Sequence, residues 1–266
     1  MGLARHLGTA AMQTAEVLFP PACPICREET GIAEMLCPDC WTDVAFLGPS
    51  GCETCNRPVP GAKPGDSVRC DDCTRHPPGW RRGAAAFQYA DVGRRLVLAL
   101  KHGDRLDLAP MLGGWLLRAG RALVLEADLV APVPLHWSRR LKRRTNQAAV
   151  LAHAVCRKAE RRDAFAPRLL LRTTRTQSQD GKNRAARTAN IAGAFTPGPD
   201  ARQIEGKRIL LIDDVLTTGA TLSEAARVCM AQGAASIDIL VLALVVSEEY
   251  PYILAAPDDE EYDEDC

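Results

Sequence analysis

The stretch from Gly206 to Leu222, G-K-R-I-L-L-I-D-D-V-L-T-T-G-A-T-L, constrains the fold more than any other part of the chain. Its apolar run, Ile209 to Ile212, has the length and composition of a strand buried on both faces, as in a parallel sheet flanked by helices. Asp213 and Asp214 follow directly. The stretch therefore predicts an α/β fold with two adjacent carboxylates at the carboxyl end of a strand.

The residues that come next have the composition of a phosphate-binding loop. They are Thr217, Thr218, Gly219, Ala220 and Thr221, and a helical pattern runs from Leu222 to Ala231. Hydroxyls, a flexible backbone and successive N–H groups before a helix can bind an anion, while carboxylates accept hydrogen bonds from sugar hydroxyls. Thr221 and Glu224 have the spacing of a capping box. An ordinary strand–turn–helix is the alternative, and D-D followed by T-T-G-x-T argues against it.

Eight of the 11 cysteines form four C-x-x-C pairs: Cys23/Cys26, Cys37/Cys40, Cys52/Cys55 and Cys70/Cys73. Two such pairs complete a tetrahedral zinc site, so the four pairs predict two structural Zn²⁺ ions. Sequential pairing, first with second and third with fourth, gives the shortest loops and is favoured, although the spacing also allows an interleaved arrangement. A redox dithiol is the alternative for one C-x-x-C, but four copies in a loop-rich stretch favour zinc. Since few apolar residues lie between the pairs, zinc would supply much of the folding free energy.

Cysteine density and the turn formers after Cys73 divide the chain. We expect an N-terminal helix over residues 1–20, a double zinc ribbon over 21–80, an α/β domain over 81–250 and a disordered acidic tail over 251–266. Within the α/β domain, strands are expected at Ala84–Ala90, from Asp128 to Pro132, at Leu169–Leu171 and at Ile237–Val246, with helical periodicity from Leu96 to Leu117 interrupted around Gly103.

Opposite charges are segregated although the formal net charge is zero. Residues 139–187 contain 15 Lys and Arg against three acids, and residues 258–265 contain seven acids and no base. The basic run follows a strand end, so contact with pyrophosphate and contact with nucleic acid are both open. Arg172 to Asn190 is polar, and we interpret it as a mobile segment that closes over a ligand, with a disordered surface loop as the alternative. Lys101 to Gly103 are expected to be solvent-exposed rather than to line a cleft.

No continuous apolar stretch approaches the length of a bilayer span, because the longest run, Ile239 to Val246, covers eight residues. The first 20 residues contain Arg5, His6 and Glu16 and lack a signal-peptide core. We therefore expect a soluble, cytoplasmic protein with no membrane span, whose cysteines are reduced metal ligands.

Taken together, these motifs resemble the ComF family, competence-associated proteins with an N-terminal double zinc ribbon and a C-terminal type I phosphoribosyltransferase-like domain. The resemblance covers Cys23 to Val246. It rests on the four cysteine pairs, V-P-L-H at 133–136 with the arginines after it, Asn146-Gln147, Arg175-Thr176 with Gln179, Arg184, Arg187 and Asn190, G-A-F at 193–195, and D-D-V-L-T-T-G-A-T. The chain has R-R-T-N-Q where the family usually has R-G-F-N-Q, so a glycine and an aromatic residue of the family pattern are replaced here.

The resemblance implies binding of phosphoribosyl pyrophosphate together with Mg²⁺. Asp213 and Asp214 would contact the ribose hydroxyls, Thr217 to Thr221 would surround the 5′-phosphate, and Pro134, Leu135, His136 and Arg139 would lie near the pyrophosphate. An active enzyme would be a glycosyltransferase that releases pyrophosphate through an oxocarbenium-like ribose. Related enzymes that act on 6-oxopurines carry an acid at the position of Thr217, and a threonine cannot serve as that base. Hypoxanthine and guanine are therefore disfavoured as acceptors.

A function of a different class fits the same features. The basic run, the zinc ribbons and the unidentified acceptor are also what a non-catalytic protein would show if it bound nucleic acid or regulated a process and used the transferase fold to sense phosphoribosyl pyrophosphate. By resemblance, the candidate macromolecular partners are single-stranded DNA and a DNA-uptake machinery.

Overall fold

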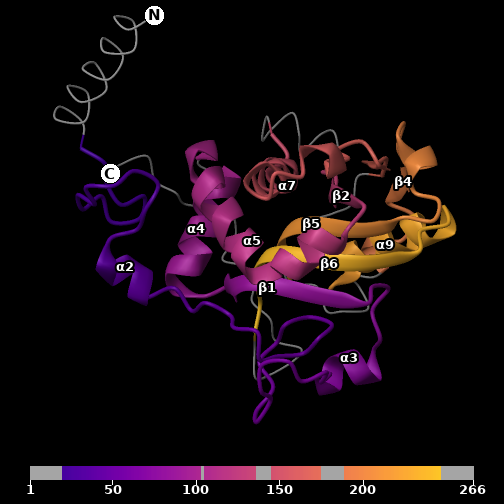
Figure 1. The fold of residues 1–266 in the computed structure, drawn as a ribbon, viewed down its shortest axis with the longest axis horizontal. Helices are drawn as coiled ribbons and strands as arrows, with labels where there is room; N and C mark the ends of the chain where they lie inside the picture. Colours follow the sequence, from indigo (N-terminus) through magenta and orange to yellow (C-terminus); the bar gives the residue numbers. More distant parts are fainter. Residues whose placement is uncertain (1–19, 103–104, 136–144, 175–188, 247–266) are drawn as a thin grey trace, which may run out of the picture.

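The computed structural model describes residues 20–102, 105–135, 145–174 and 189–246, and these are drawn in colour in Figure 1. The helix expected over residues 1–20 and the acidic tail expected over 251–266 lie, apart from Pro20, outside the described residues. So does most of the segment expected to close over a ligand.

A parallel sheet forms the centre of the described structure. Its strands are β1 (Arg82–Gln88), β2 (Leu129–Pro132), β5 (Arg208–Leu216) and β6 (Ser236–Leu244), in the order β1-β6-β5-β2. β6 is almost fully buried, and so is the run Ile209–Ile212 of β5, as continuous apolar runs require. The predicted parallel α/β sheet is therefore confirmed.

Helices cover both faces of this sheet (Figure 1). On one face, α4 (Asp91–His102), α5 (Ala109–Glu126) and α7 (Gln147–Lys158) pack their apolar sides on the strands, and Leu100, Leu112 and Leu151 are fully buried there. On the other face lie α9 (Ala220–Ala231) and the second half of the cysteine-rich region. Short 3-10 helices at Leu106–Leu108, Arg162–Ala164 and Ala201–Gln203 occur in the connections.

Two short strands form a separate antiparallel ribbon. They are β3 (Leu170–Arg172) and β4 (Phe195–Pro197), with Leu171 opposite Thr196. The Thr173 N–H donates to the Ala194 carbonyl at 3.0 Å. The strand pair thus fixes both ends of the polar segment between residues 173 and 194.

The structure extends β5 beyond its predicted end. The sequence predicted a strand that stops at Ile212, but β5 continues to Leu216 because Asp213, Val215 and Leu216 pair with Val241, Ala243 and Leu244 of β6. Backbone pairing with a buried neighbour outweighs the polarity of the two aspartates. The two aspartates therefore lie within β5, near its carboxyl end, and do not follow the strand.

The cysteine-rich region covers the edge strand β1. It contains the short helices α2 (Pro38–Thr42) and α3 (Asp71–Arg75). The Leu47 N–H donates to the Ala86 carbonyl at 3.0 Å, and the Gly83 N–H donates to the Glu53 carbonyl at 2.9 Å. These bonds satisfy part of a strand edge that would otherwise be open to pairing with other chains.

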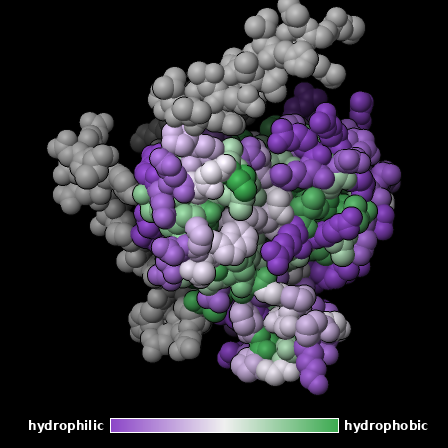
Figure 2. Space-filling model, turned by 60° about the vertical axis from the view of Figure 1, so that its left-hand side comes forward, coloured by the Kyte–Doolittle hydropathy of each residue, from purple (hydrophilic) through white to green (hydrophobic). Residues whose placement is uncertain are grey.

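One described segment, Leu106–Glu126, is long and apolar enough to cross a bilayer by length and composition. Half of its most apolar window is buried inside the structure, where Leu112 and Leu116 pack on the sheet. A core helix has the same properties, so the segment is weak evidence for a membrane span. On the face drawn in Figure 2, hydrophobic residues form separate patches among hydrophilic ones.

Candidate functional site

The two predicted acidic residues lie at the carboxyl edge of the sheet, where parallel strands present ligand sites. Asp213 and Asp214 are half-buried on β5, and an oxygen of the Asp213 carboxylate accepts a hydrogen bond from the Asp214 N–H at 2.9 Å. Lys101 Nζ lies 3.5 Å from Asp214 Oδ2, and the Lys101 side chain is only 22% exposed. The expectation that Lys101 is solvent-exposed was wrong, because the end of α4 brings its ammonium group to the acids.

Burial and charge act on Asp213 in the same direction. Burial, together with repulsion from the Asp214 carboxylate, raises the pKa of Asp213 to about 7. The Asp214 N–H, Lys101 and Arg172 offset part of this effect. A carboxyl group with a perturbed pKa at this edge of the sheet is a candidate for ligand binding.

This raised pKa predicts how stability depends on pH. The stability that Asp213 contributes is fully present below its unfolded pKa, near 4, and is lost as pH rises through about 7. Asp213→Asn keeps the group neutral and avoids that loss. Because Asp213 is only half-buried and solvent screens its charge, we expect the variant to gain about 1–2 kcal/mol at pH 8 and little at pH 5 in urea unfolding.

Asp128→Asn is the matched control for that experiment. Asp128 accepts hydrogen bonds from the side chain and the N–H of Arg208, and these contacts lower its pKa to about 2. Its replacement should reduce stability at both pH values. A stability gain in Asp213→Asn that is equal at pH 5 and pH 8 would contradict the assigned pKa.

The predicted phosphate-binding loop follows β5 directly. Gly219 has φ +77° and ψ 0°, a left-handed conformation that glycine adopts without strain, and it caps α9 at Ala220, two residues before the predicted start. The Thr218 hydroxyl accepts a hydrogen bond from the Ala220 N–H at 3.4 Å. Thr217 and Thr218 are half-buried, and Ala220 and Thr221 form the first turn of α9. The first N–H groups of this helix therefore point toward the carboxyl edge of the sheet.

The predicted capping box at Thr221 and Glu224 is wrong, since Gly219 is the N-cap residue. Glu224 is 9% exposed and accepts a hydrogen bond from the Gly193 N–H at 2.8 Å, and it also pairs with Arg227 at 2.8 Å. Its carboxylate thus holds the G-A-F segment against α9. Gly193, which follows the polar segment, is thus anchored to the helix that begins after the predicted phosphate-binding loop.

The predicted pyrophosphate residues are described in part. Pro134 and Leu135 are half-buried and follow β2, at the same edge of the sheet as Asp213. The Val133 N–H donates to the Ile212 carbonyl at 2.9 Å, and the Asn146 side chain donates to the Val133 carbonyl at 3.1 Å. Because 136–144 are not described, His136 and Arg139 lie outside the described residues. Of the described residues in this segment, Pro134 and Leu135 lie at the site.

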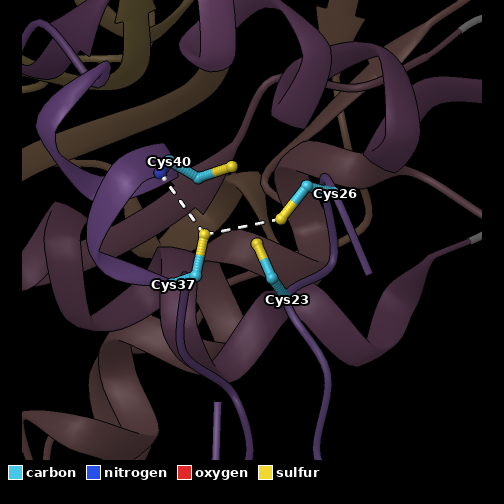
Figure 3. Close-up of side chains that lie close together, drawn as sticks. All are labelled: Cys23, Cys26, Cys37 and Cys40. Carbon is cyan, nitrogen blue, oxygen red and sulfur yellow. Dashed lines mark hydrogen bonds between the residues drawn. The ribbon is translucent and has the colours of Figure 1, made fainter. Parts of the chain in front are cut away.

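The eight predicted zinc ligands form two groups, which confirms sequential pairing. One group is Cys23, Cys26, Cys37 and Cys40, and the other is Cys52, Cys55, Cys70 and Cys73, with the sulfur atoms of each group within 4.8 Å of one another. In Figure 3, the sulfur atoms of the first group surround a common space. Cys26 and Cys37 Sγ are 3.4 Å apart, and Cys55 and Cys70 Sγ are 3.7 Å apart.

These distances and the electrostatics fit zinc. Four sulfurs at about 2.3 Å from one Zn²⁺ lie roughly 3.8 Å from one another. Within the second group, the Cys52 and Cys55 sulfurs raise the pKa of Cys73 far above its usual range. Four buried thiolates cannot remain ionised together without a cation, so the donor set is suited to a divalent metal that prefers sulfur.

Two residues near the site gave no clear signal in the sequence. Lys101 pairs with Asp214, as described above. Trp80 is 7% exposed, and its ring lies so close to Gly219 that a Cβ there would be 2.7 Å from Trp80 Cη2. The residue precedes the predicted strand, in a stretch rich in turn formers, and only the folded structure shows that it reaches the loop.

A cavity of about 220 Å³ adjoins the loop. One side is formed by Thr217 to Ala220, and the other by Cys55, Cys73 and Trp80. Further lining comes from Arg57, Asp72, His76, Pro77, Pro78, Leu216, Ser223 and Leu244. The second cysteine group therefore forms part of the environment of the predicted phosphate-binding loop.

Comparisons with known proteins find matches for both the cysteine-rich region and the α/β domain. The family model described as "Double zinc ribbon domain" matches residues 14–74, and the one described as "Phosphoribosyl transferase domain" matches residues 146–253. The "DNA utilization protein YhgH" of Salmonella typhimurium is 30% identical over 226 residues, covering 83% of this chain and 88% of the relative. The protein of the same name from Escherichia coli is 27% identical over 225 residues, covering 83% and 88%.

"Competence protein F" of Haemophilus influenzae is 26% identical over 179 residues, covering 65% of this chain and 77% of that protein. The fold, the cysteine groups and these matches define a protein in which a double zinc ribbon is joined to a phosphoribosyltransferase domain. The chain belongs to the ComF family.

One solved structure, "Structure of the allosteric regulatory enzyme of purine biosynthesis", has a TM-score of 0.35 at 19% identity. The similarity covers 55% of this chain and 30% of that chain. At this level it adds nothing to the family assignment.

Proposed function

We propose that the protein binds phosphoribosyl pyrophosphate at the carboxyl edge of its parallel sheet. The observation that carries the proposal is the position of Asp213 and Asp214 on β5, directly before a loop in which Gly219 adopts φ +77° and caps α9. Carboxylates that accept hydrogen bonds from hydroxyls and amide groups that bind a phosphate are thus adjacent in space. A ribose 5-phosphate carries both kinds of group, hydroxyls and a phosphate.

Each part of the ligand has a proposed set of contacts. The ribose hydroxyls donate to Asp213 and Asp214, and the 5′-phosphate binds Thr217, Thr218, Gly219, Ala220 and Thr221 through backbone N–H groups and hydroxyls. Pro134, Leu135, His136 and Arg139 face the pyrophosphate, which carries Mg²⁺ bound mainly through its own oxygens. Lys101 either keeps its ion pair with Asp214 or moves to the pyrophosphate, because its ammonium group compensates a negative charge in both places.

The chemistry that such a site supports is transfer of the phosphoribosyl group. The bond between ribose C1 and the pyrophosphate oxygen breaks, the ribose becomes cationic, and an acceptor attacks the same carbon. The carboxylates near the ring stabilise that positive charge, and no protein nucleophile is required. Thr217 does not supply a base, so the acceptor is not a 6-oxopurine that needs one.

The proposal includes a role in handling DNA in the cytoplasm. The role in handling DNA is supported by the names of the relatives, "DNA utilization protein" and "Competence protein F". The 15 basic residues between 139 and 187 offer phosphate contacts for a single strand. Pyrophosphate release in the presence of an acceptor panel distinguishes a transferase from a protein that only senses the ligand, because sensing produces binding without release.

Thermal unfolding with Mg²⁺ and phosphoribosyl pyrophosphate tests the site. Ligand at about 100 times its Kd stabilises the protein by about 2.7 kcal/mol, which is roughly 5–10 °C for a chain of this size. We expect the Asp213→Asn, Asp214→Asn double variant to lose this shift, because amides accept hydrogen bonds from the hydroxyls less strongly.

The matched control is Asp107→Asn with Asp200→Asn, which removes two carboxylates that pair with Arg105 and Arg168 on the surface. This control should keep the full ligand-dependent shift. Persistence of the shift in the Asp213, Asp214 variant would show that the ligand binds elsewhere.

A further inference from the structure

The two cysteine groups that would bind zinc lie against different parts of the fold. The first contacts the helical face opposite α9, where Arg95 of α4 donates to the Ile25 carbonyl at 3.0 Å and Trp41 packs edge-on against Trp115 of α5. The second packs on the α9 face with Leu216 and Ala220. Figure 1 shows α2 and α3, one from each half of the region, well apart. Of the two groups, only the second adjoins the phosphate-binding loop.

Trp80 connects the second group to this loop through direct contacts. Its indole N–H donates to the Thr54 carbonyl at 2.7 Å, and Thr54 lies between the ligands Cys52 and Cys55. Its six-membered ring lies against Gly219. The C-x-x-C turn, the indole of Trp80 and Gly219 are thus joined by a continuous series of contacts.

The C-x-x-C turn at Thr54 is itself held from two sides. The Gly83 N–H of β1 donates to the Glu53 carbonyl at 2.9 Å, and a Cβ on Gly83 would lie 2.4 Å from the Thr54 carbonyl oxygen. A metal bound to Cys52 and Cys55 would fix the other side of the turn. Without the metal, Cys52 and Cys55 lose their link to the pair at Cys70 and Cys73, and the Thr54 carbonyl is held from the side of Gly83 and Trp80 alone.

From these contacts we propose that the two zinc ions have different roles, and that the second, at Cys52, Cys55, Cys70 and Cys73, holds the phosphate-binding loop in place through Trp80. Trp80 is a positioning residue that acts on the ligand through Gly219. The first zinc stabilises the fold without affecting the loop. The part that concerns ligand affinity rests on the proposed function.

Cys40→Ser and Cys73→Ser provide a matched pair of variants. Each cysteine is the last ligand of its group, is the third residue of a five-residue helix and is 6–7% exposed. Each full-length variant should contain one zinc per chain. We expect calorimetric titration with Mg²⁺ and phosphoribosyl pyrophosphate to show at least tenfold weaker binding by Cys73→Ser and an affinity within twofold of the wild type for Cys40→Ser. Equal affinities in the two variants would overturn the inference while leaving the proposed function intact.

Amide hydrogen exchange tests the same inference without ligand. Exchange at Thr217 to Ala220 should be faster in Cys73→Ser than in the wild type and unchanged in Cys40→Ser. Unchanged exchange in both would contradict the inference. Failure of the wild type to bind phosphoribosyl pyrophosphate would overturn the proposed function, and the exchange experiment would still decide whether the second zinc supports the loop.

Tryptophan variants keep both zinc ions and cover the case in which Cys73→Ser does not fold. Trp80→Leu should contain two zinc ions per chain and bind the ligand at least fivefold more weakly, and Trp80→Phe should recover part of that loss because its ring still packs on Gly219. Trp115→Leu, which alters the aromatic contacts with Trp41 and Phe46 near the first cysteine group, should bind the ligand normally. Normal binding by Trp80→Leu would overturn the role of Trp80.

Discussion

Removal of both zinc ions should unfold the cysteine-rich region and expose the edge strand β1. Structural zinc supplies about 10–16 kcal/mol of apparent binding free energy in zinc-finger peptides, and this region has little apolar surface of its own to replace it. Since hydrogen bonds from Gly83, Leu47 and Gln88 join the region to β1, unfolding leaves that strand open to other chains. We expect a strong chelator to abolish the near-ultraviolet circular dichroism of the region and to cause light scattering at micromolar protein concentration.

The control is the same chelator saturated with zinc before it is added. It should leave the spectrum unchanged, and metal analysis of the untreated protein should give two zinc ions per chain. A metal-free, reduced sample that keeps its near-ultraviolet spectrum and remains clear would contradict a folding role for zinc and would reopen the interpretation of the pairs as redox dithiols.

Gly219→Ala should be the most damaging single substitution in the proposed phosphate-binding loop. An alanine at φ +77° is strained by about 1–2 kcal/mol, and its Cβ would lie 2.7 Å from Trp80 Cη2, so the indole or the loop must shift. We expect a total loss of about 2–4 kcal/mol in the free energy of unfolding, together with loss of phosphoribosyl pyrophosphate binding. Urea unfolding and calorimetric titration measure the two effects.

Gly206→Ala separates the cost of backbone strain from the cost of the contact with Trp80. Gly206 has φ +69°, but no atom lies within 4 Å of the position its Cβ would occupy. This variant should lose only the strain, about 1 kcal/mol, and keep ligand binding. If Gly219→Ala costs no more than Gly206→Ala, the contact between Gly219 and Trp80 has no energetic weight.

The elements that depend on local pattern could be predicted from the sequence. The apolar runs at Ile209–Ile212 and Ile237–Val246 mark the two inner strands, because burial on both faces requires continuous apolar residues. Loop length favoured sequential pairing of the cysteines, and the structure decided between that arrangement and an interleaved one. For these features, neighbours in the sequence are also neighbours in the structure.

Features that depend on distant residues could not be predicted in this way. The charge of Lys101 gives no sign that α4 ends beside Asp214, and the spacing of Thr221 and Glu224 matches a capping box although Glu224 binds Gly193 instead. Trp80 reaches Gly219 across 139 positions of the chain because the second cysteine group packs on α9. Each of these contacts depends on how sheet, helices and ribbons are assembled.

A crystal structure of the protein with phosphoribosyl pyrophosphate and Mg²⁺ tests the central claim most directly. The account predicts density for the ribose within hydrogen-bond distance of Asp213 and Asp214, with the 5′-phosphate against the N–H groups of Thr218 to Thr221. Ligand density at any other place on the protein, or a site that stays empty in crystals soaked at millimolar ligand, would contradict it.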